Sequence, residues 1–312
     1  MPFKERIRVL NLIDLHTHTN YSDGTATVEE TLSLAEKLGL SFLSVTDHNT
    51  VNAYDELLQK KHLFSGKLVS GVELGTTFRC ESIEILGYGI NIEKIKPLIS
   101  ENYLSFYEKN VRAAALDAIA TVKNGAALSP DFVKTMCEHP EAIFDPEREN
   151  DRPYLLAELQ RHPENARFFG SRDEFESITR HRFTREYLFN PQSPLFSDQS
   201  SLVPSIEKVI RIIKECGGLA FLAHPFVYSE NIINALDEVV AYGLDGIECY
   251  YGTFNEAQKQ FLEAYSDKNG LLKSGGSDHH GLDMRPNNIM GRSAGEAIPY
   301  SLVSSWIDKI AF

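Results

Sequence analysis

The sequence predicts an α/β protein, either a parallel α/β barrel or a doubly wound sheet, with a mainly helical insertion. Short apolar strands alternate with helical stretches over residues 11–90, and the same alternation resumes at residue 204. Between them, residues 93–200 are mostly helical or irregular, with polar and proline-containing pieces. We therefore expect an α/β domain over residues 1–92 and 201–312, and an inserted helical subdomain over residues 93–200.

Four strands are expected in the N-terminal part of the α/β domain, over residues 10–15, 41–48, 67–74 and 82–90. A helix over residues 27–40 separates the first two. Thr27 is its predicted N-cap, Glu30 completes a capping box, and Gly39 lies near its end. A second helix is expected over residues 51–63.

The C-terminal part continues the alternation after the insertion. Pro204 opens a helix that closes on the paired glycines Gly217 and Gly218. Further strands are expected over residues 219–226, 245–251 and 271–280, with helices over residues 230–242 and 255–269. The total of about seven strands in 312 residues fits one barrel with an insertion, or two ordinary domains.

Composition and charge exclude several classes of function. The net charge of −13 argues against broad electrostatic capture of DNA or RNA, so stable duplex binding is not expected, although local cations can still bind phosphates. The apolar stretches are too short for a membrane span of about 20 residues, and the N-terminus lacks the apolar core of a signal peptide. Four cysteines without a C-x-x-C pair predict reduced, mostly buried thiols, which suits a cytoplasmic protein.

Residues that can bind metals collect where the predicted strands end. They are His16 and His18, Asp47 and His48, Glu73, Glu84, His224, and Asp278 and His280. Asp23 lies in a Ser-Asp-Gly turn shortly after the first pair. Because barrels and open α/β sheets build their sites at the carboxyl ends of strands, we expect these side chains to converge.

Residue spacing adds detail to this expectation. Side chains two positions apart in an extended strand point the same way, so His16 and His18 can face one metal. Asp14 shares that parity and could orient a ligand from behind. The same rule pairs Asp278 with His280 and turns His279 away.

The donor types predict the class of metal. Imidazole with carboxylate suits Zn, Mn, Fe or Ni rather than Ca, and a carboxylate among imidazoles can bridge two ions, as in two-metal phosphoryl transfer sites. Each motif alone also has a structural interpretation: Asp23 as a turn residue, Asp47 as a helix N-cap. Glu84 interrupts an apolar strand and is either an outward-facing residue or a carboxylate that reaches the site.

Two arginines are candidates for binding phosphate. Arg152 opens a predicted helix with Pro153 at its first turn, and Arg292 follows the last metal-capable cluster after a glycine. Each could instead form a surface salt bridge. The functional interpretation is capture of a phosphate by the forked donors of the guanidinium group.

Five motifs together resemble the PHP (polymerase and histidinol phosphatase) superfamily: DLHTHTNYSDG, LSVTDHNTV, GVEL, LAHP and GSDHH. The nearest resemblance is to its branch of small bacterial metal-dependent phosphoesterases, which act on nucleoside phosphates and the ends of short RNAs. It covers residues 11–90 and 204–295. The resemblance implies a distorted seven-stranded (β/α) barrel that carries the metal site, with the helical insertion over the active site.

The resemblance also implies up to three metal sites. The first ion would be held by His16, His18, Glu73 and Asp278. Glu73 would bridge to a second ion shared with His224, and the third would be held by Asp23, His48 and His280.

Two positions depart from the pattern of this branch. Glu84 stands where a histidine is usual, and it could still ligate the second ion with a harder, more negative donor. Tyr154 replaces the histidine of an Arg-Pro-His motif; it can donate a hydrogen bond but carries no positive charge near neutral pH.

The expected function is hydrolysis of a phosphomonoester of a nucleotide or small phosphorylated metabolite by a metal-activated water, with two to three divalent Mn, Zn or Fe ions. Arg152 and Arg292 would offset the phosphate charge, and Asp278 or a water would manage the leaving-group proton. Two alternatives remain: phosphodiester or exonucleolytic cleavage at short oligonucleotide ends, and a non-catalytic metal-binding module. The sequence does not predict the oligomeric state.

Overall fold

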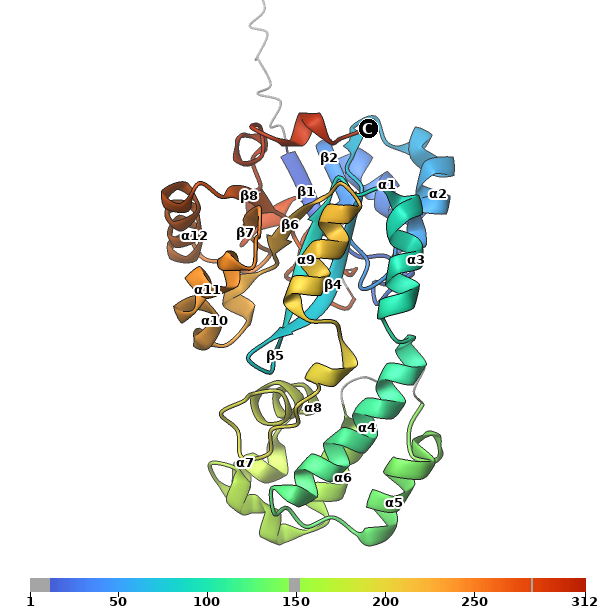
Figure 1. The fold of residues 1–312 in the computed structure, drawn as a ribbon, viewed down its shortest axis with the longest axis vertical. Coiled ribbons are helices and arrows are strands. Elements are labelled where there is room, and N and C mark those ends of the chain that lie inside the picture. The colour runs from blue at the N-terminus through green and yellow to red at the C-terminus, as the bar shows by residue number, and fades with distance from the viewer. Residues whose placement is uncertain (1–11, 146–151, 282) are drawn as a thin grey trace, which may run out of the picture. The chain divides into compact units, whose positions relative to one another are not determined.

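The computed structural model describes residues 12–145, 152–281 and 283–312, which divide into two compact units (Figure 1). The first unit contains the chain up to Gly75, Glu84–Glu101 and Ile206–Phe312. The second contains Thr76–Ile83 and Asn102–Ser205, so it includes a hairpin tip as well as the long helical segment. Residues 10 and 11 of the first expected strand, and residues 146–151 of the insertion, lie outside the described part.

The described strands form three sheets. A parallel sheet has the order β1-β2-β3, with strands Leu12–Thr17, Leu40–Val45 and Lys67–Leu68. A five-stranded sheet has the order β4-β5-β6-β7-β8, with strands Gly71–Phe78, Glu81–Tyr88, Leu219–Leu222, Gly246–Tyr250 and Leu272–Gly275. The small antiparallel pair is β9 (Arg292–Ser293) and β10 (Glu296–Ala297).

None of these described sheets closes into the seven-stranded barrel that the resemblance implied. The expected third strand is divided between β3 and β4, which belong to different sheets. β4 and β5 form a hairpin whose turn, Arg79–Cys80, has φ values of 51° and 66°, as in the two-residue turns that join neighbouring antiparallel strands. β5 then pairs antiparallel with β6, while β6, β7 and β8 are parallel. The sheet is therefore mixed.

Backbone hydrogen bonds link the two larger sheets where their strands end. His18 N donates to His279 O at 2.9 Å, and Asp278 N donates to His16 O at 2.8 Å. At the other edge, Asn49 N donates to Glu73 O at 2.8 Å. These bonds bring the ends of β1 and β2 beside the chain that follows β8 and beside β4.

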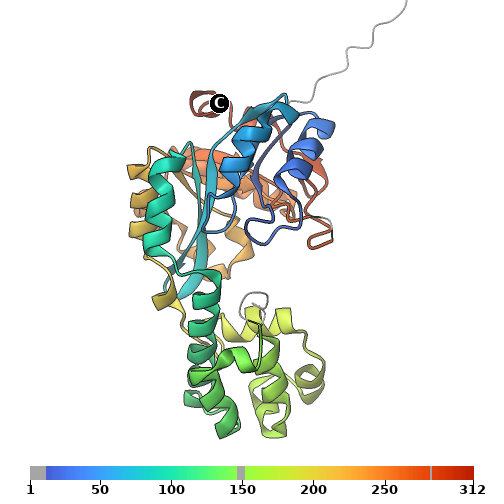
Figure 2. The same ribbon diagram turned by 90° about the vertical axis from the view of Figure 1, so that its right-hand side faces the viewer.

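Helices of the first unit surround these strands (Figures 1 and 2). They are α1 (Val28–Leu38), α2 (Ala53–Lys60), α3 (Ile92–Asn102), α9 (Ile206–Glu215), α10 (Glu230–Asn234), α11 (Leu236–Ala241) and α12 (Glu256–Asn269). The capping box of Thr27 with Glu30 is confirmed, and Gly39 ends α1 in the left-handed conformation. The single helix expected over residues 230–242 is divided at Ala235 into α10 and α11.

The core of the first unit lies on the strands. Ile13 and Leu15 of β1 are fully buried, and they alternate with Asp14 and His16 along the same strand. Tyr88 and Phe221 pack with Trp306, with ring centroids 5.1–5.8 Å apart. This packing fixes the strands whose ends carry the polar side chains.

The second unit has its own apolar core, which includes Leu155, Leu159, Phe183 and Leu188. Its helices are α4 (Phe106–Lys123), α5 (Pro130–Glu138), α6 (Pro153–Gln160), α7 (Arg172–Ser177) and α8 (Arg180–Arg182), followed by a π-helical stretch over Phe183–Leu188. In the described part of the chain, no helix has the length and apolar character needed to cross a membrane.

Candidate metal centre

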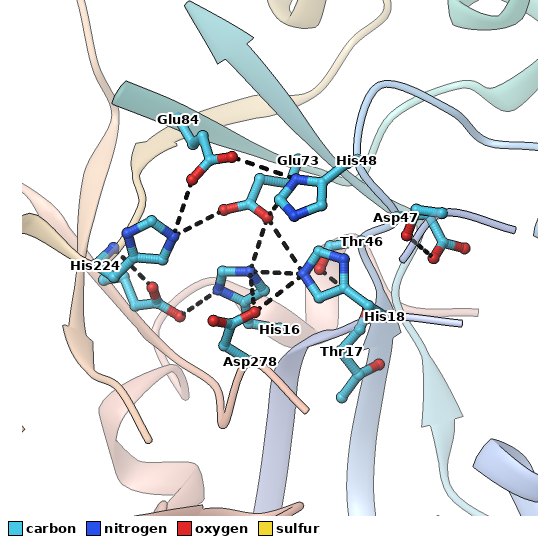
Figure 3. A network of polar contacts seen from close by, with 12 residues as sticks. His16, Thr17, His18, Thr46, Asp47, His48, Glu73, Glu84, His224 and Asp278 are labelled. Carbon is cyan, nitrogen blue, oxygen red and sulfur yellow. Dashed lines mark hydrogen bonds and ion pairs between the residues drawn. The ribbon is translucent and has the colours of Figure 1, made fainter. Parts of the chain in front are cut away.

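All nine side chains predicted as metal ligands lie in the first unit. Figure 3 labels all of them except Asp23 and His280. β1 carries His16, and His18 follows it; Glu73 lies in β4 and Glu84 in β5. His48, His224 and the pair Asp278 and His280 follow β2, β6 and β8. Eight of them, all except His224, fall into three groups, and within each group one ligand atom per residue lies within 4.8 Å of the others.

The first group joins His16, His18, Glu73 and Asp278. Glu73 Oε2 lies 3.1 Å from His16 Nε2 and 3.2 Å from His18 Nε2. Asp278 Oδ1 lies 3.5 and 3.1 Å from the same two nitrogens. All four side chains are essentially buried, and their lone pairs face one small volume, which is an arrangement suited to one ion.

The second group joins Glu73, Glu84 and His48, with His224 in contact. His224 Nε2 lies 3.0 Å from Glu73 Oε1 and 3.3 Å from Glu84 Oε2. Glu84 Oε1 lies 3.3 Å from His48 Nδ1. Of the two interpretations of Glu84, the structure shows the inward one, because its carboxylate lies between two imidazoles (Figure 3).

The third group joins Asp23, His280, His48 and His18. Asp23 Oδ1 lies 3.1 Å from His280 Nε2, 3.7 Å from His48 Nε2 and 3.8 Å from His18 Nδ1. Asp47 stays outside the group and shapes the turn instead, accepting bonds from Thr19 N at 2.7 Å and Ser22 Oγ at 2.7 Å. His18, His48 and Glu73 each take part in two groups, so the three form one continuous centre.

The turn that presents Asp23 depends on a glycine. A Cβ atom on Gly24 would lie 2.6 Å from His18 O, closer than nonbonded atoms approach. The Ser-Asp-Gly sequence therefore lets the turn fold back against the end of β1.

The family model of the PHP domain matches residues 14–162. The chain therefore contains a PHP domain over these residues. That match includes six of the nine predicted ligands, namely His16, His18, Asp23, His48, Glu73 and Glu84.

Two curated relatives of this PHP protein are enzymes that cleave phosphate esters. It is 25% identical over 271 residues to the 3′,5′-nucleoside bisphosphate phosphatase of Chromobacterium violaceum, which covers 86% of this chain and 87% of that protein. It is 25% identical over 272 residues to a 5′-3′ exoribonuclease of Haemophilus influenzae, covering 86% and 89%. A solved structure of an amidohydrolase from Chromobacterium violaceum shares the fold, with a TM-score of 0.63, 22% identity and coverage of 96% and 97%.

Glu248 supports the PHP site from behind and was missed in the sequence. Its buried carboxylate accepts a hydrogen bond from His16 Nδ1 at 2.9 Å and another from His224 N at 2.8 Å. A bond at Nδ1 leaves Nε2 of His16 free to face the first group. The available signal was a single glutamate within the apolar strand β7, the same signal that marked Glu84.

Asp14 also lies behind the site, at the parity predicted for it. It acts on backbone and not on an imidazole: it accepts from His16 N at 3.2 Å, Ser277 N at 2.9 Å and Gly291 N at 2.7 Å. These bonds connect β1 to the segment that presents Asp278. Burial raises the pKa of Asp14, opposed by the bond from the Ser277 hydroxyl.

Two of the predicted ligands adopt unusual backbone conformations. His224 has φ 23° and Asp278 has φ 55°, a region that non-glycine residues seldom occupy. Both are buried and lie at strand ends. Such backbone strain is typical of positions where a side chain must be aimed at a functional site.

Burial and neighbouring charges shift the pKa values of the cluster in opposite directions. Burial lowers the pKa of His18, but Asp278 and Glu73 outweigh it and raise this pKa to about 9. For His224, burial is likewise outweighed, by Glu73 and Glu84, and the pKa rises to about 10. Burial would raise the pKa of Asp278, yet His16, His18 and Arg285 hold it well below its ordinary value. The carboxylates thus attract cations to this volume.

The residues present fit divalent metal ions. Glu73 Oε2 and His280 Nε2 are buried atoms that make no well-aligned hydrogen bond, and the groups that lie about 3.1 Å from them are other predicted ligands. His16 Nε2 and His18 Nε2 lie only 3.1 Å apart, a placement that a shared ion would account for. Mixed imidazole and carboxylate donors suit borderline transition metals.

The two predicted arginines make contacts of their own. Arg292 is exposed, and its Nη1 donates to Gly295 O at 3.3 Å within the turn between β9 and β10. Arg152 lies in the second unit, buried, with Nε donating to Asp117 at 2.7 Å. Arg285, which was not predicted, contacts the carboxylate of Asp278. His279 faces away as expected, with Nδ1 bonded to Asn288 O at 2.7 Å.

Proposed function

We propose that this PHP protein is a metal-dependent phosphoesterase that hydrolyses a phosphomonoester of a nucleotide or a small phosphorylated metabolite. The observation that carries the proposal is the continuous centre of three donor groups, joined by His18, His48 and Glu73. Adjacent ions in such a centre can hold both the attacking and the leaving oxygens of phosphoryl transfer. The curated relatives, a nucleoside bisphosphate phosphatase and an exoribonuclease, support a substrate of the nucleotide class.

Two to three divalent transition metal ions, Mn, Zn or Fe, would occupy the groups. Bound there, the ions would lower the pKa of water toward neutrality and offset the charge of phosphate oxygens. His16, His18, Glu73 and Asp278 would hold the first ion; Glu73, Glu84 and His224 the second; Asp23, His48 and His280 the third. Glu248 keeps Nε2 of His16 turned toward the first group.

The environment of Asp278 argues against a role in moving the leaving-group proton. Its Oδ2 accepts from Tyr251 at 2.8 Å and contacts Arg285, while its Oδ1 faces His16 and His18. Its lowered pKa makes it a weak base and leaves it without a proton to give at neutral pH. We therefore assign Asp278 to ligation and the proton to water. Arg152 stays a prediction for phosphate binding.

The free cysteines also support a location in a reducing compartment of the cell. All four cysteines are unpaired; Cys216 and Cys249 are buried as expected, whereas Cys80 and Cys137 are exposed. Exposed free thiols suit a compartment that keeps them reduced, so we propose the cytoplasm.

The test measures phosphate release from a panel of substrates. Protein whose metal content is known by elemental analysis is assayed with nucleoside monophosphates, nucleoside 3′,5′-bisphosphates and sugar phosphates, with Mn or Zn added and then with chelator. We expect turnover that chelator abolishes. Equal release in both conditions would contradict the proposal.

Two alternatives are separated by the same preparation. A short oligoribonucleotide with a 5′ phosphate that is shortened one nucleotide at a time would identify exonucleolytic cleavage, the activity of the Haemophilus influenzae relative. Fewer than two transition metals per chain, together with no turnover on any substrate, would favour a non-catalytic metal-binding module.

A further inference from the structure

We propose that Arg285 binds the phosphate group of the substrate at the open rim of the metal centre. The inference deepens the proposed phosphoesterase function and rests on it. It assigns to Arg285 the role that sequence analysis gave to Arg292, which is exposed and bonded within its own turn.

The exposure of the side chains shows where substrate can enter. His16, His18 and Glu73 are completely buried, and Asp278 and His280 nearly so. Four side chains at the centre are open to solvent: Asp23 (40%), His48 (24%), Glu84 (28%) and Arg285 (39%). A phosphate approaching the ions must therefore pass this rim, of which Arg285 is a part.

The charge of the rim makes a cation necessary. Asp23 and Glu84 are carboxylates, and the buried groups behind them add Glu73 and Asp278. A phosphate dianion is repelled by every carboxylate whose charge an ion does not cancel. Among the described residues, Arg285 contacts a proposed ligand through its guanidinium group, and it also interacts electrostatically with Asp23 and Glu73.

The backbone holds Arg285 in place for this role. Arg285 N donates to Gly281 O at 3.0 Å, and Asn288 N donates to Arg285 O at 3.0 Å. The amide of Asn288 is itself buried and donates to Ser277 O at 2.8 Å, next to Asp278. The loop is thus anchored to the ligand segment, and the arginine does not have to be ordered by substrate.

The guanidinium group contacts Asp278 through Nη1, while the side chain as a whole is 39% exposed. Arg285 Nη1 contacts Asp278 Oδ2, the oxygen that faces away from the imidazoles of the first group. An arginine has five N–H donors in a planar fork, so donors remain for phosphate oxygens after this contact. Asp278 thereby orients the fork while its Oδ1 still faces the first group.

The test measures binding of inorganic phosphate to the manganese-loaded protein by calorimetry, which does not require turnover. We expect Arg285→Ala to weaken phosphate binding about tenfold or more, since charge-assisted hydrogen bonds are lost. Arg285→Lys should fall between the two, because it keeps the charge but not the fork. Arg211→Ala, an exposed arginine of α9, is the matched control and should change the affinity less than about twofold.

Elemental analysis of each variant separates this role from a purely structural one. We expect Arg285→Ala and Arg285→Lys to keep the metal content of the parent protein. Unchanged phosphate affinity in Arg285→Ala would overturn the proposal. Loss of metal in both variants would also overturn it, because Arg285 would then act by holding Asp278. Absence of phosphomonoester turnover with normal phosphate binding would contradict the proposed function alone.

Discussion

At the scale of single residues, the centre is built from side chains that serve two neighbours at once. His18 presents Nε2 to Asp278 and Nδ1 to Asp23, and Glu73 divides its two oxygens between His16 and His224. Because of this sharing, a substitution of His18, His48 or Glu73 affects two groups, whereas a substitution of an unshared residue affects one. The outcome depends on whether the residue that is changed belongs to one group or to two.

Asp23 belongs to the third group alone, so Asp23→Ala should affect that group selectively. We expect the variant to bind fewer ions per chain while the first group, whose ligands are untouched, stays filled. Elemental analysis after extensive dialysis measures this. Asp55→Ala, an exposed aspartate of α2, is the control. Loss of all metal, or no loss, would show that the assignment of Asp23 is wrong.

Glu248 tests the importance of the groups behind the ligands. Glu248→Ala removes the acceptor for both His16 Nδ1 and His224 N, and we expect the affinity for metal to fall by about 10–100-fold. Glu248→Gln keeps one oxygen and should recover part of the loss. Competition with a metal-binding dye gives the affinities, with Glu207→Gln on α9 as the exposed control. An affinity unchanged in the alanine variant would contradict the role.

At the scale of secondary structure, α6 is joined to the start of α5 by one buried carboxylate. Glu158 Oε1 accepts from Ser129 N at 2.9 Å and from its hydroxyl at 2.6 Å, and Oε2 pairs with Arg161. Although burial opposes it, the bonds from Ser129 lower the pKa of Glu158 to about 2. A folded-state pKa below the unfolded one means that the carboxylate stabilises the fold above the unfolded pKa.

Glu158→Gln should therefore reduce the free energy of unfolding by about 1–3 kcal/mol at neutral pH. The difference from the parent protein should shrink as pH falls from about 4.5 toward 2, because the parent carboxylate becomes protonated. Denaturant unfolding at several pH values measures it. Glu138→Gln, exposed at the end of α5, should stay within about 0.5 kcal/mol. A difference that does not depend on pH would contradict this account.

The elements also show what the sequence could and could not predict. Helix α1 was predictable because Thr27, Glu30 and Gly39 are local signals, and all three are confirmed. The division between β3 and β4 was not predictable, since residues 67–74 fit the pattern of one strand and periodicity does not mark a change of sheet. His280 lies in the third group and His279 faces away, as the parity rule predicted, although these residues follow the end of β8 and Asp278 is not extended.

Other features of the site depend on contacts between distant segments. Arg285 and Arg292 both follow the last motif, and only the folded loop shows which one contacts Asp278. Glu248 resembles an outward-facing strand residue until β1 is placed beside β7 and β8. The inward orientation of Glu84 also could not be predicted without the geometry of the β4–β5 hairpin.

At the scale of the whole molecule, protonation of the site makes the stability of the fold depend on pH. In the metal-free protein, carboxylates raise the pKa of His18 to about 9 and that of His224 to about 10. These ion pairs stabilise the fold fully below the unfolded histidine pKa near 6.5, and this contribution is lost as pH rises through 9 to 10. Metal ions must displace the same protons.

We therefore expect the affinity for Mn or Zn to increase as pH rises from about 6.5 toward 9, with proton release on binding. Calorimetry in buffers of different ionisation enthalpy gives both quantities. Asp23→Ala, which leaves His224 and its two carboxylate partners intact, should keep most of the dependence. An affinity that is constant or falls over this range would contradict the account.

The hairpin β4–β5 has a consequence for how such proteins can be recombined. Its base carries Glu73 and Glu84, whereas its tip, residues 76–83, belongs to the helical unit. Replacing residues 102–205 alone would therefore combine a new helical segment with the original hairpin tip, although the two belong to one compact unit. A chimera that takes the second unit of another PHP protein needs two exchanged segments, and the shorter one begins three residues after Glu73, a predicted metal ligand. The second unit therefore cannot be exchanged as one continuous segment, because the β4–β5 hairpin belongs to both units.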